Sequence, residues 1–276
     1  MQLQGDRPDV AIVIATFNAA NYLAATLESI SSQVDFAPNR VSVVLVDGGS
    51  TDETVEIARQ SGVVDLLISE PDRGIYDAMN KGADRATSRW LHFLNAGDSF
   101  ENIHALSNIL AALDEAELAR TPWMVAGALN LGGGMSAPNR LISNIPHIWW
   151  RHAWGIQPHC HQATWFRRDV FLASGSYSLN FGTASDFDLI VRFGMLGHPH
   201  ELTQTTINYL GGGVSEKKAS QTPKILHAVR VERMQLTGPL RVLDRGITHL
   251  VTIINAARKY GGLAKRFMKR RRSAQG

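Results

Sequence analysis

Two continuous apolar runs restrict the fold of this 276-residue sequence more than any other feature. They are "VAIVIAT" at 10–16 and "VSVVLVD" at 41–47, and both are rich in β-branched residues. Strands that are apolar at every position, not at alternate ones, are typical of parallel sheets covered by helices on both faces. The segment between the runs, "NYLAATLESISSQ", has apolar residues at helical spacing, as a crossover between parallel strands requires. The sequence therefore begins with a predicted βαβ unit.

The alternation of strand and helix continues to about residue 100 and then becomes less regular. In the first part we expect a helix that starts at Ser50 or Thr51 and ends at Gly62, a strand at 64–69, a helix at 75–87 and a strand at 90–95. In the second part we expect a helix at 102–119, a strand at 123–129, a loop to about 160, a strand entering a helix at 161–174, a helix at 184–197, a short strand at 203–210 and helices from 222. This order predicts an α/β fold with a doubly wound, mostly parallel sheet and a C-terminal helical extension.

Composition and termini suggest where such a protein works. Hydrophobic residues make up 44% and charged residues 19%, which suits a globular chain with a substantial core. A single cysteine, Cys160, excludes an internal disulfide framework and suits a reducing compartment. The start of the sequence lacks the basic and apolar stretches of a signal peptide, and no apolar run is long enough to cross a bilayer. We expect a cytoplasmic protein, in solution or peripheral on the inner face of the membrane.

The positive charge of the chain is concentrated near its end. The formal net charge is only +3, but "RKYGGLAKRFMKRRRSAQG" is densely basic and places Leu263, Phe267 and Met268 at helical spacing. Basic amphipathic segments bind anionic membranes; a solubilising tail is the alternative. A nucleic-acid binder more often carries its charge across a folded face, so we expect no nucleic-acid partner.

Polar residues follow each of the first four predicted strands. Because ligands of open parallel sheets bind outside the carboxyl ends of the strands, Asp47, Asp72, Arg73 and Asp98 are expected on one rim. Turn preferences account for each residue separately but not for their convergence. The sequence has neither G-x-G-x-x-G after the first strand nor a Walker lysine loop, so a bound diphosphate would need another source of positive charge. A divalent cation held by Asp98 would supply it.

Four segments together resemble family 2 glycosyltransferases of the GT-A fold: "VAIVIATFNAANYLAATLESISSQ", "VVLVDGGSTDET", "EPDRGIYDAMNKGADRA" and "WLHFLNAGD". The likeness is greatest to bacterial enzymes that build exopolysaccharides such as colanic acid, or the sugar part of glycolipids. It resumes at "HQATWFRRDVF", "ASDFDL" and "GGGVS". The resemblance implies an inverting, metal-dependent transfer of a sugar from a UDP- or GDP-linked donor to a hydroxyl of a glycan or lipid-linked acceptor.

The resemblance also implies a donor site and a metal site. The residues expected to bind the nucleotide-sugar are Thr16, Asn18, Asp47, Asp72, Arg73, Lys81, Asn95 and Gly97. A solvated helix lysine is an equal alternative for Lys81. Asp98 corresponds to the last acid of the family's D-x-D motif, whose first acid is missing here, and is expected to bind Mn²⁺ or Mg²⁺; a turn aspartate is the alternative. His161 is a second candidate metal ligand.

The remaining implied residues concern the acceptor. In "SDFDL" (185–189), Asp186 occupies the position of the family's catalytic base, with a helix N-cap as its alternative role. His159, His161 and Trp154 are expected on the acceptor side, where buried imidazoles and core packing are the competing interpretations. The loop "GGGVS" (211–215) is similar to one that closes over the donor.

The resemblance divides the chain into a donor-binding half at 1–100, an acceptor-binding and catalytic half at 101–221 and a basic helical tail at 222–276. Two other classes of function stay open. A hydrolase could use Cys160 beside the histidines, or Ser215 with Lys218, although neither has a surrounding oxyanion motif. A noncatalytic nucleotide-sugar-binding protein is favoured only by the missing acid of the metal motif, and the retained Asp186 argues against it.

Overall fold

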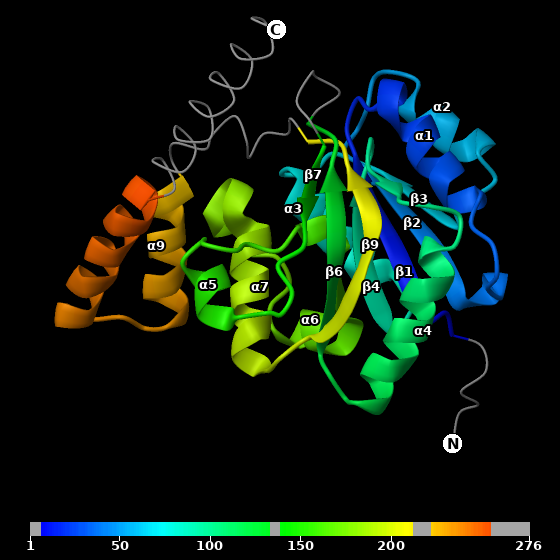
Figure 1. The fold of residues 1–276 in the computed structure, drawn as a ribbon. Coiled ribbons are helices and arrows are strands. Elements are labelled where there is room, and N and C mark those ends of the chain that lie inside the picture. Colours follow the sequence, from blue (N-terminus) through cyan, green and yellow to red (C-terminus); the bar gives the residue numbers. More distant parts are fainter. Residues whose placement is uncertain (1–6, 133–138, 212–221, 255–276) are drawn as a thin grey trace, which may run out of the picture.

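A computed structural model describes residues 7–132, 139–211 and 222–254 of the protein, and in those ranges nine strands form one sheet (Figure 1). The strand order is β3-β2-β1-β4-β8-β6-β9-β5, and β7 pairs with β6. The strands β1, β2, β3, β4, β6 and β9 all run in one direction, because β8 is antiparallel to both β4 and β6. Their carboxyl ends therefore meet at one edge of the sheet.

The strands are β1 (Val10–Thr16), β2 (Val41–Asp47), β3 (Leu66–Ser69), β4 (Trp90–Asn95), β5 (Ser99–Phe100), β6 (Trp123–Asn130), β7 (Arg140–Ile142), β8 (Thr164–Arg167) and β9 (His200–Tyr209). The helices are α1 (Ala20–Ser31), α2 (Thr54–Gln60), α3 (Ile75–Arg85), α4 (Ala105–Leu118), α5 (Trp149–Ala153), α6 (Arg168–Ala173), α7 (Ser185–Leu196) and α9 (Thr222–Arg233), followed by a helix over 238–254. The fold is α/β with a mixed, mostly parallel sheet, as the sequence predicts.

Burial along β1 explains its apolar sequence. Every residue of this strand is buried, and alternate residues enter two different cores. Ile12 and Ile14 pack in the core that contains α1 and α4, whereas Ala11 and Val13 pack in the core that contains α3 and α7. The prediction of parallel strands covered on both faces is confirmed.

The prediction that residues 130–160 form a loop is wrong in part. The structure places β7 there, paired with the end of β6, and the short helix α5. Trp149 of α5 packs on α7 where Gly194 leaves room, since a Cβ on that glycine would lie 2.3 Å from Trp149 Cδ1. The element is held by this tertiary contact and not by local helical periodicity, which explains why the sequence pattern did not reveal it. The last strand of the sheet, β9, also begins three residues before the expected start at 203.

The packing of α3 on the sheet depends on a glycine. A Cβ on Gly82 would lie 2.4 Å from Val13 Cγ1 and 3.2 Å from Val46 Cγ2. We expect Gly82→Ala to lower the free energy of unfolding by about 1–3 kcal/mol, because overpacking outweighs the gain in helix propensity. Chemical denaturation measures this. Gly246, whose Cβ would meet nothing within 4 Å, is the matched control, and Gly246→Ala should stabilise the protein by up to about 1 kcal/mol. Equal effects of the two variants would contradict the packing argument.

The C-terminal helical extension is joined to α7 through a buried carboxylate. Asp188 is fully buried and accepts hydrogen bonds from Arg192 Nε at 3.0 Å and from Arg233 Nε of α9 at 2.6 Å. Phe187 and Val191 of α7 share a small core with Val229 of α9. In the described ranges, no helix combines the length and the apolar character needed to cross a membrane.

Candidate active site

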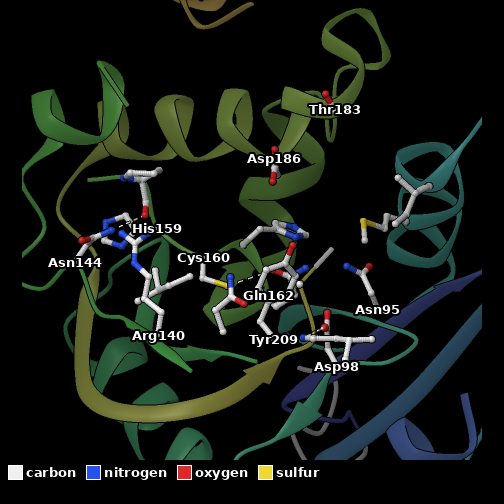
Figure 2. Close-up of a pocket in the computed structure, with 18 of the residues that line it drawn as sticks. Asn95, Asp98, Arg140, Asn144, His159, Cys160, Gln162, Thr183, Asp186 and Tyr209 are labelled. Atoms are coloured by element: carbon white, nitrogen blue, oxygen red, sulfur yellow. Dashed lines mark hydrogen bonds between the residues drawn. The ribbon is translucent and has the colours of Figure 1, made fainter. Parts of the chain in front are cut away.

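A cavity of about 780 Å³ lies at the carboxyl-end edge of the sheet. Its walls come from the ends of β4, β6 and β9, the start of α3, the start of α7 and the segment before β8. Figure 2 shows Asn95 and Asp98 on one side of the cavity, Asp186 on the α7 wall, and Arg140, Asn144 and His159 toward the far end. The carboxylates of Asp98 and Asp186 point into the same space from different walls.

The turn after β4 places Asp98 in this cavity. Gly97 has a positive φ of 99°, a conformation that favours glycine, and a Cβ there would meet Leu210 Cδ2 at 2.8 Å. The turn is fastened to α1 through Thr26, whose hydroxyl accepts a hydrogen bond from Gly97 N–H and donates one to the carbonyl of Asp98, both at 2.8 Å. These contacts give the side chain of Asp98 one defined direction.

Two buried oxygen atoms near this turn have no hydrogen-bond partner among the described residues: Asp98 Oδ2 and Asn95 Oδ1. Asp98 is only 3% exposed, and its Oδ1 accepts a hydrogen bond from Leu210 N–H at 2.9 Å. Burial raises the pKa of Asp98 to about 7, against smaller opposing effects of the Leu210 and Asn95 backbone amides and of the Gln162 and Asn95 side chains. Unpaired carboxylate and amide oxygens are ligands that Mg²⁺ and Mn²⁺ accept, so these residues fit a divalent cation. Within the described part of the chain, no cluster of three or more His, Cys, Asp or Glu side chains could hold a metal.

Asp186 lies in the first turn of α7, on the wall opposite the sheet edge. Burial raises its pKa to about 6, and hydrogen bonds from Phe187 N–H and the Tyr76 side chain oppose that rise. The residue that caps the helix by position is Ala184 and not Asp186. A partly buried carboxyl with a pKa near neutrality can accept a proton at physiological pH, which suits a general base.

The two candidate histidines also line the cavity, and both are neutral. His161 Nε2 is hydrogen-bonded to the Tyr177 hydroxyl, and burial lowers the pKa of His161 to about 3. His159 Nε2 lies 2.7 Å from His147 Nδ1, and its ring stacks with His147 and His152. Burial, followed by the neighbouring imidazoles, lowers the pKa of His159 to about 3. Both expected acceptor-side histidines therefore belong to the cavity wall. In His161, the Nε2 atom is already hydrogen-bonded to Tyr177.

The residues expected to bind the nucleoside lie at the ends of β1 and β2, outside the wall of this cavity. Asp47 is fully buried and accepts hydrogen bonds from Gly49 N–H, Ser50 N–H and Ser69 Oγ at 2.8–3.1 Å. Burial alone would raise the pKa of Asp47, but a hydrogen bond from the Ser50 hydroxyl, together with these three, lowers it below its ordinary value. Thr16 Oγ1 lies 3.4 Å from the same carboxylate. The oxygens of Asp47 thus organise the turn that follows β2.

Three more expected donor ligands follow β3: Asp72 and Arg73 in the loop, and Lys81 on α3. Asp72 lies against the β2 turn, since a Cβ on Gly48 would be 2.4 Å from Asp72 Oδ2. Arg73 has a side chain that is 76% exposed and pairs with Asp77 at 2.8 Å. Lys81 is not part of the cavity wall; its partly exposed side chain pairs with Glu70 at 2.8 Å and donates to the Pro71 carbonyl at 2.9 Å.

Asn18 and Trp154 have local structural contacts. Asn18 has a positive φ of 48° and accepts a hydrogen bond from Thr51 N–H at 2.9 Å. Trp154 is not part of the cavity wall; it packs in the small core between α7 and α9, 5.2 Å from the Arg230 guanidinium. For the Trp154 position the structure therefore shows core packing.

Several residues of the site have no counterpart among the expected ones. Phe17, directly after β1, is 63% exposed, an unusual value for a large aromatic side chain. Tyr209 and Leu210 end β9 beside Asp98, and the rule that ligands meet the carboxyl ends of strands could have found them. Arg140 could not have been found, because it lies on β7 in the segment expected to be a loop.

Cys160 lines the cavity, but its environment opposes a nucleophilic role. Burial raises the pKa of the thiol to about 12, so the reactive thiolate is not populated at neutral pH. We expect Cys160→Ala to keep catalytic activity within about twofold of the wild type, measured as kcat/KM. A loss of activity in a folded variant would restore the hydrolase alternative. Ser215, Lys218 and the "GGGVS" segment from 212 onward lie outside the described residues.

Comparison with known proteins agrees with this architecture. The model of the glycosyl transferase family 2 matches residues 11–172. A PGL/p-HBAD biosynthesis glycosyltransferase of Mycobacterium tuberculosis is 35% identical over 196 residues, which cover 67% of this chain and 69% of that protein. An uncharacterized glycosyltransferase of the same species is 30% identical over 198 residues, covering 70% of this chain and 71% of that protein.

Solved structures with low sequence identity share the fold. TarS from S. aureus in complex with UDP-GlcNAc aligns with a TM-score of 0.63 at 16% identity, over 88% of this chain and 70% of that one. A mannosyltransferase from Pyrobaculum calidifontis in complex with GDP-Man and Mn²⁺ aligns with a TM-score of 0.62 at 15% identity, over 95% and 80%. The chain spans 65% of the length of another TarS structure, of residues 1–349.

The fold is GT-A, and the cavity lies at the carboxyl ends of its parallel strands, the edge where open α/β sheets bind ligands. The protein belongs to glycosyltransferase family 2 and is a glycosyltransferase.

Proposed function

We propose that the protein is an inverting, metal-dependent glycosyltransferase that moves a sugar from a nucleotide-sugar to a hydroxyl of a glycan or lipid-linked acceptor. The observation that carries the proposal is the entry of Asp98 and Asp186 into one cavity from different walls. Their environments suit two different tasks: a nearly enclosed carboxylate with an unpaired oxygen, and a carboxyl with a pKa of about 6 at a helix start.

Asp98 and Asn95 would hold the divalent cation through their unpaired oxygens. A bound Mn²⁺ or Mg²⁺ would neutralise the charge of the donor diphosphate. Water and the donor's own phosphate oxygens would supply further oxygen ligands. The amide oxygen of Asn95 would then stand in for the missing first acid of the D-x-D motif.

Asp186 would act as the general base. Its carboxylate takes the proton of the acceptor hydroxyl while that oxygen attacks the anomeric carbon of the sugar. The bond from the anomeric carbon to the diphosphate breaks, and the nucleoside diphosphate leaves with the electron pair. One displacement inverts the configuration, so no protein nucleophile is needed. The hydrogen bond from Tyr76 positions the carboxylate and keeps its pKa from rising further.

The donor nucleoside would bind along the ends of β1, β2 and β3. Thr16, Asn18, Asp47 and Asp72 frame this edge, and the exposed ring of Phe17 offers a surface on which a base can stack. Arg73, with its exposed guanidinium, is the better placed of the two candidate diphosphate ligands. Lys81 supports the same loop through Glu70. Gly97, whose turn holds Asp98 beside Leu210, would let the donor approach this backbone.

The acceptor would enter at the opposite end of the cavity. There His159, His161, Arg140 and Asn144 form the wall, and Arg140 is the cation among the described lining residues. A relative named for PGL/p-HBAD biosynthesis supports a glycolipid acceptor. We assign donor binding to residues 1–100, acceptor binding and catalysis to 101–221, and membrane contact through the basic tail to 222–276, of which 255–276 lies outside the described residues.

A donor screen tests this proposal. The protein is incubated with UDP-GlcNAc or GDP-Man, a lipid extract as acceptor and Mn²⁺, and the release of nucleoside diphosphate is followed. We expect acceptor-dependent release with one nucleotide and a product of inverted anomeric configuration. Nucleotide binding without release, for every donor and acceptor tested, would favour the noncatalytic nucleotide-sugar-binding alternative. A product with retained configuration would contradict the role of Asp186.

A further inference from the structure

The helix over 238–254 is attached to the protein by its polar side. Asp244 is 3% exposed and accepts hydrogen bonds from Arg230 of α9, Nε to Oδ1 at 2.8 Å and Nη2 to Oδ2 at 3.0 Å. Arg230 also donates to Thr248 Oγ1 at 2.5 Å and to the Ala153 carbonyl at 2.7 Å. This buried network fixes which side of the helix faces the protein.

The apolar side of the same helix faces away from the protein. Its large side chains that are at least 40% exposed are Leu240, Val242, Leu243, Leu250, Ile253 and Ile254. At 3.6 residues per turn, Leu240, Leu243, Leu250 and Ile254 fall on one face. A surface helix ordinarily buries its apolar stripe and exposes its polar one. The arrangement here is the reverse, and contiguous exposed apolar surface of this kind marks an interaction site.

The charges around this face indicate which partner it fits. Arg241 and Arg245 are exposed on the same helix, on the side next to Val242 and away from the Leu240, Leu243, Leu250 and Ile254 stripe. Asp244 is the last acidic residue of the sequence, whereas 255–276 contains eight Lys and Arg residues. A helix that exposes an apolar stripe, carries exposed cations and runs directly into a densely basic segment of sequence matches an interface of acyl chains and anionic headgroups. A second copy of the chain would bring the same cations together, which opposes pairing through this face.

We propose that the apolar face of helix 238–254, defined by Leu240, Leu243, Leu250 and Ile254, docks on an anionic membrane surface. The proposal assigns the contact to a helix packed on the folded protein and not to the basic tail alone, and it does not depend on the transfer reaction. Figure 1 shows this helix on the side of the molecule far from α1 and α2, so docking leaves the ends of β1 and β2 accessible.

Vesicle co-sedimentation of the full chain tests the proposal. The vesicles are phosphatidylcholine alone or phosphatidylcholine with phosphatidylglycerol. The main variant is Leu243→Asp/Leu250→Asp. Its matched control is Leu118→Asp/Leu196→Asp, which changes two leucines at the ends of α4 and α7 that are similarly exposed (Leu196) or more exposed (Leu118). Arg241→Gln/Arg245→Gln tests the charges separately, and circular dichroism verifies folding.

We expect the wild type and the control variant to bind anionic vesicles, and Leu243→Asp/Leu250→Asp to bind about tenfold more weakly or less. Arg241→Gln/Arg245→Gln should also weaken binding about tenfold and reduce its salt dependence. Three outcomes would overturn the proposal: no preference of the wild type for anionic vesicles, undiminished binding of the leucine variant, or dimers in sedimentation velocity that this variant dissociates without any vesicle binding by the wild type.

Discussion

Replacing Asp186 by Asn is expected to lower kcat by about a thousandfold, in the middle of the range for loss of a general base. The amide keeps the size of the side chain but cannot take the acceptor proton. Donor affinity should change by less than about twofold, because a base that acts on the acceptor contributes little to donor binding. Steady-state kinetics with the active donor, together with donor calorimetry, measures both quantities.

Asp169→Asn is the matched control, since this acid lies in the first turn of α6 and outside the cavity. It should leave kcat unchanged. In the wild type, kcat/KM should rise with pH through about 6, because Asp186 must be ionised to act as the base. Tyr76→Phe removes a hydrogen bond that lowers the pKa of Asp186. The rise of kcat/KM should therefore occur at higher pH in this variant. A kcat of Asp186→Asn close to that of the wild type would remove the residue from the mechanism.

The second large effect concerns stability in the absence of metal. The pKa of Asp98 in the folded state is about 7, well above the ordinary 3.8. Between pH 3.8 and about 7 the folded state therefore keeps a proton on Asp98 that the unfolded state has lost. The contribution of Asp98 to the free energy of unfolding is therefore most favourable below pH about 4 and decreases as the pH rises to about 7. At neutral pH the metal-free wild type should be less stable than Asp98→Asn, by on the order of 4 kcal/mol.

Thermal unfolding of both proteins in EDTA, across this pH range, measures the difference. Added Mn²⁺ should raise the Tm of the wild type, because a cation offsets the buried charge, and should leave Asp98→Asn nearly unchanged. The lower stability of the metal-free wild type would then result from burying an Asp98 carboxylate whose charge only a bound metal offsets. A variant that is less stable than the wild type at pH 7 in EDTA would show that the carboxylate is a structural turn residue.

The parts of the fold that the sequence predicts are those with local signals. The strands β1 and β2 have apolar residues at every position, and this pattern requires burial on two faces. The positions of β7 and α5 depend on contacts with β6 and α7, distant in sequence, and the pattern between residues 130 and 160 has no periodicity that reflects them. The family resemblance and the GT-A fold are confirmed by the comparisons.

In the candidate site, too, residues with a local sequence signal could be predicted, whereas contacts between distant segments could not. Asp98 and Asp186 could be singled out because one ends a strand and the other starts a helix within family motifs. Their convergence on one cavity, and the unpaired oxygen of Asn95, become visible only when β4, β9 and α7 are brought together. Trp154 shows the limit of an aromatic-rich sequence as a guide, since Trp149 and Trp154 pack against a core whereas Trp150 between them is 50% exposed.

Calorimetry of UDP and GDP binding, with and without Mn²⁺, to the wild type and to Asp98→Asn tests whether Asp98 forms a metal-dependent donor site. We expect one nucleotide to bind the wild type in a Mn²⁺-dependent manner, and Asp98→Asn to lose this dependence while remaining folded. Binding of that nucleotide with equal affinity to both proteins, whether or not Mn²⁺ is present, would contradict a metal-dependent donor site at the end of β4.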